Sequence, residues 1–264
     1  MIGADILLSC LEKQGVDLVF GLPGGAVIPL YDRLKHFGVK HILMRHEQGA
    51  VHAADGYARA TGKVCVCFAT SGPGAANMMT GLGTASMDSI PLVMISGQVA
   101  SSLLWKDSFQ EAYVTGMADA VTKASVMVTD ASQIPQVLAD AFYIASHGRP
   151  GPVLVDIPKD LFTQDVKNPD LDVEPTERYR RKLKNSVITR EQIRKVGRML
   201  AEAKKPLIII GGGVNTTEAV RKNVLTVVDQ LDVPISQTLM ANGVIPGDNK
   251  NFVGMVGMHG TKDG

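Results

Sequence analysis

One carboxylate stands where a strand is expected to end and a helix to begin. Glu47 follows the apolar segment 41–44, which predicts a strand, and precedes a series of alanines at helical spacing (Ala50, Ala53, Ala54, Ala58). Open α/β sheets bind ligands at the carboxyl ends of their strands, so this carboxylate can face a cleft while helix N-terminal amides hold it. The alternative is an ordinary acidic residue that the helix dipole favours at a helix start.

Two glycine-rich turns follow apolar segments in the same way. Segment 16–20 leads into 21–26, and segment 64–69 leads into 70–77. Glycine lets the backbone approach a ligand closely, because no Cβ stands in the way. Neither spacing is that of a dinucleotide fingerprint or a P-loop, so we predict neither. A plain tight turn is the alternative interpretation of both.

Apolar segments and amphipathic helices alternate through the first part of the chain. Strands are expected at 16–20, 41–44, 64–69, 91–95, 124–128 and 153–157. Residues 98–120 show no period, which is typical of a functional loop. The alternation predicts an α/β fold in which a mostly parallel sheet carries helices on both faces.

A polar, proline-containing stretch divides the chain. We expect a first domain at 1–162, a linker at 163–187 and a second α/β domain at 188–264. The second domain shows too few strands to close a core of its own, so we expect it to be incomplete.

Capping residues mark the helices of the second domain. Thr189 and Gln192 form a capping-box pair, and Asn215 and Glu218 are expected to form another. Strands are expected at 206–210 and 233–236.

Composition excludes several classes of protein. The 264 residues carry a net charge of +1, which gives no reason to expect a nucleic-acid partner. The short basic run in 178–184 is flanked by acids and is expected to be solvated. No apolar run reaches membrane-spanning length, and the first residues lack a secretory pattern. We expect a globular protein without a membrane partner.

The three cysteines are expected to be reduced. Cys65 and Cys67 alternate along one strand, so both side chains face the same side, and no histidine accompanies them or Cys10. Zinc is therefore not expected. Buried reduced thiols predict a cytoplasmic protein.

These motifs together resemble those of thiamine-diphosphate enzymes and, among them, the acetolactate (acetohydroxyacid) synthase large subunits. The resemblance covers the whole chain. It rests on 20–26, 45–48, 70–74 with Asn77, 107–111 and 156–160.

The resemblance implies that the first domain binds the aminopyrimidine of thiamine diphosphate. Glu47 would hydrogen-bond a ring nitrogen and stabilise the imino tautomer, which removes the thiazolium C2 proton. Gly25, Pro73 and Asn77 would line the pyrimidine pocket. Phe109 and Gln110 would reach the reacting centre, and Lys159 would favour anionic substrates at its mouth. From the residues alone, Lys159 is a solvated lysine at a strand end and Gln110 a surface loop residue.

The resemblance also implies structural FAD in the second domain. The matching positions are Arg149, Gly212, Gly213, Thr238, Leu239, Met240, Met258, His259 and Gly260. Residues 241–243 depart from the family's glycine-rich continuation, which argues against FAD binding by this chain alone. The diphosphate and its Mg²⁺ would be held by a third domain, of which the sequence contains no element. This chain alone is therefore expected to be inactive.

The implied reaction joins pyruvate, after decarboxylation, to a second pyruvate or to 2-ketobutyrate in branched-chain amino-acid biosynthesis. The implied assembly is at least a homodimer, to which a small regulatory subunit can belong. Three alternatives stay open: another thiamine-diphosphate decarboxylase or oxidase, a split enzyme, and a non-catalytic α/β binding module.

Overall fold

The structure divides into two units. A computed structural model describes residues 1–184, 188–215 and 217–262, and the chain separates into Met1–Asn185 (unit 1) and Ser186–Gly264 (unit 2). The predicted domain boundaries stay a prediction.

Unit 1 is built on a six-stranded sheet in the order β2-β1-β3-β4-β6-β5. The strands are β1 (Leu18–Gly21), β2 (Lys40–Leu43), β3 (Cys65–Ala69), β4 (Leu92–Gln98), β5 (Ala124–Met127) and β6 (Val153–Pro158). Every neighbouring pair is parallel, so all carboxyl ends lie along one edge. The predicted fold class is confirmed, and each predicted strand is found within a few residues of its expected bounds.

Helices precede, connect and follow these strands. They are α1 (Gly3–Lys13), α2 (Ile28–Leu34), α3 (Glu47–Thr61), α4 (Pro73–Asn77), α5 (Met79–Asp88), α6 (Val114–Ala118), α7 (Ile134–Ser146) and α8 (Glu177–Lys184). Short 3₁₀ turns are η1 (Ser101–Leu103), η2 (Ala131–Gln133) and η3 (Lys159–Phe162). The segment expected to be irregular therefore contains η1 and α6.

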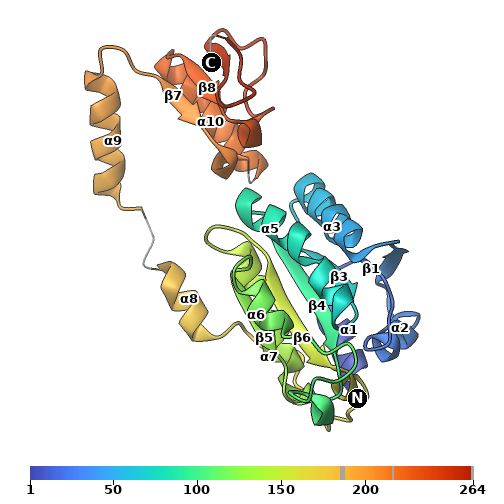
Figure 1. Ribbon diagram of the computed structural model, residues 1–264. Helices are drawn as coiled ribbons and strands as arrows, with labels where there is room; N and C mark the ends of the chain where they lie inside the picture. The colour runs from blue at the N-terminus through green and yellow to red at the C-terminus, as the bar shows by residue number, and fades with distance from the viewer. Residues whose placement is uncertain (185–187, 216, 263–264) are drawn as a thin grey trace. The chain divides into compact units, whose positions relative to one another are not determined.

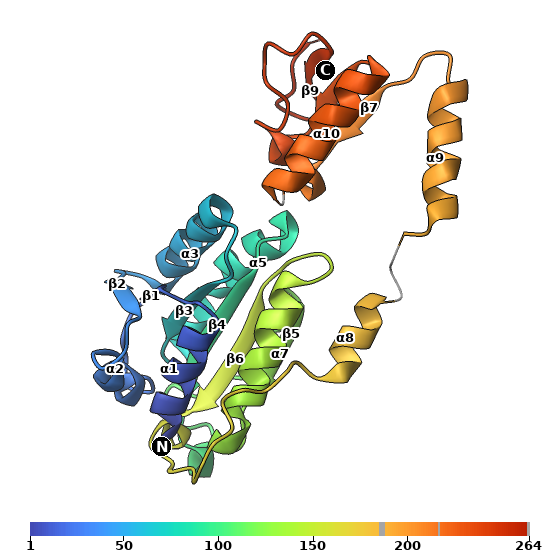
Figure 2. The ribbon, with the colours of Figure 1, turned by 180° about the vertical axis from the view of Figure 1, so that it is seen from behind.

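Both faces of the sheet are covered. Helices α1 and α7 lie on one face, and α3 and α5 lie on the other (Figures 1 and 2). Side chains alternate between two buried apolar clusters: Val66 and Phe68 join the α1 side, whereas Cys65 and Cys67 join the α3 side. This alternation follows from the period of two along a strand.

The expectation of buried, unpaired thiols is confirmed. Cys10, Cys65 and Cys67 are all free and buried. Burial raises the pKa of the Cys65 thiol to about 12, so it stays protonated at neutral pH. Within the described residues, no group of histidine, cysteine and acidic side chains has the arrangement of a metal site.

The segment predicted as a linker, 163–187, begins as an ordered part of unit 1. The Val166 N–H donates to the Met1 carbonyl oxygen (2.9 Å), and helix α8 follows. Residues 185–187 lie outside the described residues.

Unit 2 contains a smaller parallel sheet in the order β7-β8-β9. Its elements are α9 (Arg190–Glu202), β7 (Ile208–Ile210), η4 (Gly212–Val214), α10 (Glu218–Leu231), β8 (Ile235–Gln237), η5 (Leu239–Ala241) and β9 (Phe252–Met255). Strand β9 was not expected from the sequence. One small buried apolar cluster lies among the elements from β7 to β9, and Val228 of α10 belongs to it.

One of the two predicted caps of unit 2 is confirmed. Thr189 and Gln192 form a capping box at the start of α9. The pairing of Asn215 with Glu218 is wrong, because Thr217 caps α10 and its Oγ1 accepts the Val220 N–H at 3.2 Å. Thr217 lies directly before the first helical residue, where a capping oxygen reaches the free amides of the first turn.

None of the described helices combines the length and the apolar character needed to cross a bilayer.

Candidate active site

Glu47 lies at the first position of α3, at the carboxyl edge of the sheet, as the sequence predicts. His46 is the N-cap residue, and its Nδ1 accepts the Gln48 N–H at 3.1 Å. Before it, the Met44 N–H donates to the Gly21 carbonyl oxygen (2.9 Å), which keeps the chain beside β1. Glu47 is thereby fixed with 6% of its surface exposed.

The Glu47 carboxylate is held by a side chain from another turn. Asn77, the last residue of α4, donates from Nδ2 to Glu47 Oε2 at 3.0 Å. We expected amides of the helix N-terminus to bind this carboxylate. In the described residues, the Gln48 N–H instead donates to His46 Nδ1. This hydrogen bond between Asn77 and Glu47 fixes the orientation of one carboxylate oxygen.

Gly74 allows this close packing. A Cβ built on Gly74 would lie 3.1 Å from Glu47 Oε1 and 2.7 Å from a Thr70 methyl carbon. Any side chain there would displace the carboxylate or the turn.

Thr70 joins the two glycine-rich turns. Its Oγ1 accepts the Ala26 N–H at 3.1 Å, and a Cβ on Gly24 would lie 2.6 Å from the Thr70 Cβ. A Cβ on Gly25, by contrast, would meet nothing within 4 Å. Gly25 therefore borders open space beside a rigid turn, and Pro73 occupies the first turn of α4. This combination suits a flat ligand lying against the backbone.

The loop after β4 contributes Phe109 and Gln110. Gly72 has φ +59°, and a Cβ on it would lie 2.6 Å from the Gln110 carbonyl oxygen, so the two backbones are in contact. Phe109 is 89% exposed. The structure thus brings Gln110 to the turn that carries Asn77 and presents Phe109 to solvent.

Lys159 is exposed at the end of β6. Its neighbour Asp160 accepts the Ser101 N–H at 2.8 Å, which ties this end to the loop after β4. Lys159 is therefore placed along the carboxyl edge, and the described residues show no hydrogen bond or ion pair that occupies its ammonium group.

A buried acid lies behind that loop. Asp156 accepts from Ser96 Oγ (2.6 Å) and from Gln98 Nε2 (3.0 Å). Burial raises the pKa of Asp156 to about 6, and the two hydrogen bonds oppose this rise. Asp156 and Gln98 line a cavity of about 310 Å³ whose wall also includes Glu111.

In unit 2, the proposed FAD positions gather at the ends of the strands. Gly212 and Met240 are in contact, since a Cβ on Gly212 would lie 3.0 Å from the Met240 Cβ. The Thr238 N–H donates to the Ile210 carbonyl oxygen (2.9 Å). The neighbouring positions are Gly213 in η4, Leu239 in η5, and the exposed turn after β9 with Met258, His259 and Gly260.

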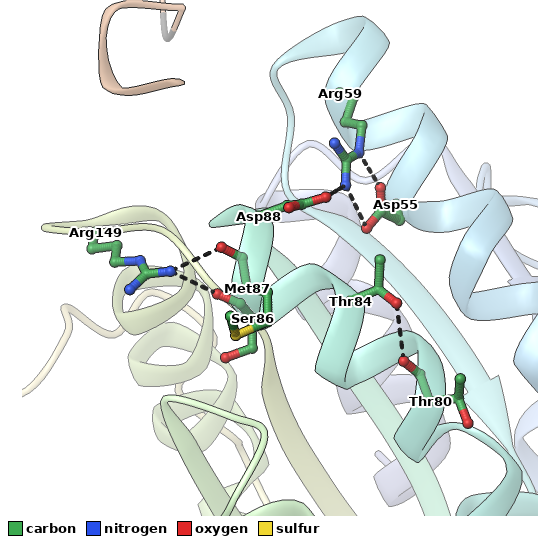
Figure 3. A network of polar contacts seen from close by, with 8 residues as sticks. All are labelled: Asp55, Arg59, Thr80, Thr84, Ser86, Met87, Asp88 and Arg149. Atoms are coloured by element: carbon green, nitrogen blue, oxygen red, sulfur yellow. Dashed lines mark hydrogen bonds and ion pairs between the residues drawn. The ribbon is translucent and has the colours of Figure 1, made fainter. Parts of the chain in front are cut away.

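Arg149 belongs to unit 1 and is engaged there. Its guanidinium donates to the carbonyl oxygens of Ser86 (3.1 Å) and Met87 (3.0 Å) at the C-terminal end of α5 (Figure 3). A cation at this end of a helix satisfies free carbonyl groups and complements the dipole. The structure thus gives Arg149 a role within unit 1, and its FAD contact stays a prediction.

The sequence interpretation did not assign Thr70, Glu111 or Asp156 a role. Asp156 carried a signal, because it is the one acid within the apolar run 153–157. Thr70 carried a weaker one, as a hydroxyl at the junction of a strand and a glycine-rich turn. Glu111 carried no signal, because its hydrogen bonds lie within a segment that has no helical or strand periodicity.

Comparisons with known proteins identify the family of this chain. The family described as "Thiamine pyrophosphate enzyme, N-terminal TPP binding domain" matches residues 1–121, and "Thiamine pyrophosphate enzyme, central domain" matches residues 193–264. The chain belongs to the thiamine pyrophosphate enzymes.

Within that family, the chain is similar to proteins named acetolactate synthase. The chain is 47% identical over 262 residues to the acetolactate synthase large subunit of Haemophilus influenzae. The alignment includes 98% of this chain and 45% of that protein. It is 47% identical to the Corynebacterium glutamicum large subunit, of which it covers 41%, and 99% of this chain is aligned. It is 46% identical to the acetolactate synthase isozyme 2 large subunit of Escherichia coli, with 99% of this chain and 46% of that protein covered. The chain thus spans less than half the length of these relatives.

Proposed function

We propose that this chain forms the pyrimidine-binding part of an acetolactate synthase. The complete enzyme would decarboxylate pyruvate on thiamine diphosphate and join the remaining two-carbon unit to a second 2-keto acid, either pyruvate or 2-ketobutyrate. The observation that carries the proposal is the buried Glu47 carboxylate, held by Asn77 at the carboxyl edge of a parallel sheet. The relatives named acetolactate synthase support the particular reaction.

Thiamine diphosphate, when bound, supplies the carbon nucleophile and the electron sink for decarboxylation. Glu47 would hold a proton at a ring nitrogen of the pyrimidine, and Asn77 would keep the carboxylate oriented toward it. The open backbone at Gly25 and the rigid turn at Pro73 would seat the ring.

Gln110 and Phe109 would border the reacting centre, and Lys159 would attract the carboxylate of the keto acid. Gln110 is supported by its contact with the turn that carries Asn77. Lys159 is supported by its exposed position along the same edge. An ammonium group there acts as a point charge for an anionic substrate.

Further cofactors and partners are part of the proposal. We propose that Mg²⁺ binds the diphosphate through residues outside this chain, and that unit 2 takes part in a structural FAD site through 212–213, 238–240 and 258–260. We also propose a homo-oligomer, at least a dimer, to which a small regulatory subunit can bind.

Product analysis tests the reaction. The complete enzyme containing this chain is supplied with pyruvate, thiamine diphosphate, Mg²⁺ and FAD, and the products are separated by chromatography. We expect 2-acetolactate as the main product, and 2-aceto-2-hydroxybutyrate when 2-ketobutyrate is added. Acetate or acetaldehyde as the main product would instead indicate another thiamine-diphosphate oxidase or decarboxylase, and no product would favour a non-catalytic module.

A further inference from the structure

The loop between β4 and α6, residues 99–113, is held by a carboxylate of its own. Glu111 is half-buried and accepts backbone N–H groups from Trp105, Lys106 (3.3 Å) and Ser108 (2.9 Å). The loop is thereby closed into a ring around one side chain. A carboxylate can accept several such bonds at once, because its two oxygens offer about four lone-pair positions.

The loop needs this support because its backbone is unusual. Trp105, Asp107 and Gln110 have φ values of 64°, 51° and 61°, a region that residues with side chains rarely adopt. Such conformations persist where surrounding contacts fix them, and they gather at functional sites. The hydrogen bonds from Ser108 and its neighbours lower the pKa of Glu111, so the side chain is ionised at neutral pH.

The loop is fixed to the rest of unit 1 by contacts at Gln110 and at Ala112. On one side, the Gln110 backbone rests against Gly72, where there is no room for a Cβ. On the other, Gln98 Nε2 donates to the Ala112 carbonyl oxygen at 2.9 Å. A shift in Glu111 would therefore move Gln110 relative to the turn that carries Asn77.

We propose that Glu111 is a positioning residue, whose carboxylate fixes the 99–113 loop so that Gln110 and Phe109 stand at the reacting centre. Glu111 acts through the loop and touches no reacting atom. The effect on catalysis rests on the proposed function, whereas the effect on the loop does not.

The test compares two Glu-to-Gln variants in the complete enzyme. Glu111→Gln weakens the ring of hydrogen bonds. Glu12→Gln is the matched control, because Glu12 also accepts a backbone N–H, that of Gly38 (2.6 Å), at the end of α1. Amide hydrogen exchange of 105–108 and steady-state kinetics with pyruvate are measured for both.

We expect Glu111→Gln to speed exchange at 105–108 about tenfold and to lower kcat about tenfold, with KM for pyruvate changed by no more than about twofold. Glu12→Gln should leave both within about twofold. When Gln110→Ala is already present, adding Glu111→Gln should lower kcat no more than about twofold further, because the two residues act as one unit. If Glu111→Gln fails to fold, Glu111→Asp keeps the charge with a shorter reach and should show intermediate effects on both readouts.

The outcomes separate the two proposals. Unchanged exchange and unchanged kcat in Glu111→Gln, with an active wild type, would overturn the role of Glu111. Fully additive losses with Gln110→Ala would overturn it as well. A wild type that forms no acetolactate would overturn the proposed function, while faster exchange in Glu111→Gln would still establish that Glu111 holds the loop.

Discussion

Each of the two units contains its own parallel sheet, and the two sheets differ in how their faces are covered. In unit 1, a buried apolar cluster lies against each face, and polar side chains such as Glu47 and Asp156 are held buried at or near the carboxyl edge. In unit 2, the described residues form one apolar cluster, and Met258, at the corresponding edge, is 95% exposed. Coverage of both faces fixes the strand ends, so that side chains from separate turns can meet with defined geometry.

Helix α9 shows the same difference at the level of one element. Three of its apolar side chains, Ile193, Val196 and Met199, are more than half exposed. In α1 the equivalent leucines are fully buried. Amphipathic spacing predicts the helix in both cases, but only packing gives it stability.

The largest expected effect concerns the buried carboxylate of unit 1. Glu47→Gln keeps the shape of the side chain and removes its basicity, so we expect kcat of the complete enzyme to fall about 10²–10⁴-fold. Steady-state kinetics on folded protein, verified by circular dichroism, measure it. Glu218→Gln in unit 2, where the carboxylate pairs with Lys222 on the exposed face of α10, is the control and should change kcat less than about twofold. A Glu47→Gln enzyme that keeps near-normal kcat would remove Glu47 from its assigned role.

A pair of isoleucines tests the difference in coverage directly. Ile95→Ala in β4 removes a fully buried side chain and should lower the free energy of unfolding by about 2–5 kcal/mol. Ile193→Ala in α9, where the side chain is 62% exposed, should change it by less than about 0.5 kcal/mol. Urea denaturation measures both. Equal losses would show that another part of the complete protein covers α9.

Buried Asp156 should make the stability of unit 1 depend on pH. Its pKa is raised from 3.8 to about 6, so the folded state binds the proton more tightly than the unfolded state. The contribution of Asp156 to stability is therefore largest below pH 4, falls as pH rises toward 6 and is then constant. The total change is roughly 3 kcal/mol, because each pKa unit corresponds to 1.36 kcal/mol.

Asp156→Asn isolates this contribution. The difference in unfolding free energy between the variant and the wild type should shift in favour of the variant by about 2–3 kcal/mol between pH 4 and pH 7. Denaturation at a series of pH values measures this difference. A difference that does not vary with pH would contradict the raised pKa.

The smallest expected effect concerns a cap in unit 2. Thr217→Ala removes the hydroxyl that accepts the Val220 N–H and should cost about 1 kcal/mol. Asn215→Ala should cost less than about 0.5 kcal/mol, since Asn215 is exposed and does not cap α10. Thermal unfolding of the two variants compares them. A larger loss for Asn215→Ala would restore the pairing expected from sequence.

Local patterns carry much of the fold. The strands and main helices of unit 1 are signalled by apolar runs and helical periods, and Glu47 is placed correctly by the junction of two such patterns. Strand β9 escaped prediction because residues 252–255 form a short run without alternation. The wrong cap at α10 arose because several polar residues stand side by side before the helix, and only the backbone geometry selects Thr217.

The amino-acid sequence by itself determined the α/β class, the glycine-rich turns and the residue types available for chemistry, since these depend on neighbours in the chain. Only the tertiary structure decided that Asn77 holds Glu47 and that Thr70 joins the turn at Ala26. The contact between the Gln110 backbone and Gly72 was likewise decided only by the tertiary structure. These partners lie 30 or more residues apart, and the order of the strands in the sheet, which no local pattern specifies, is what brings them together.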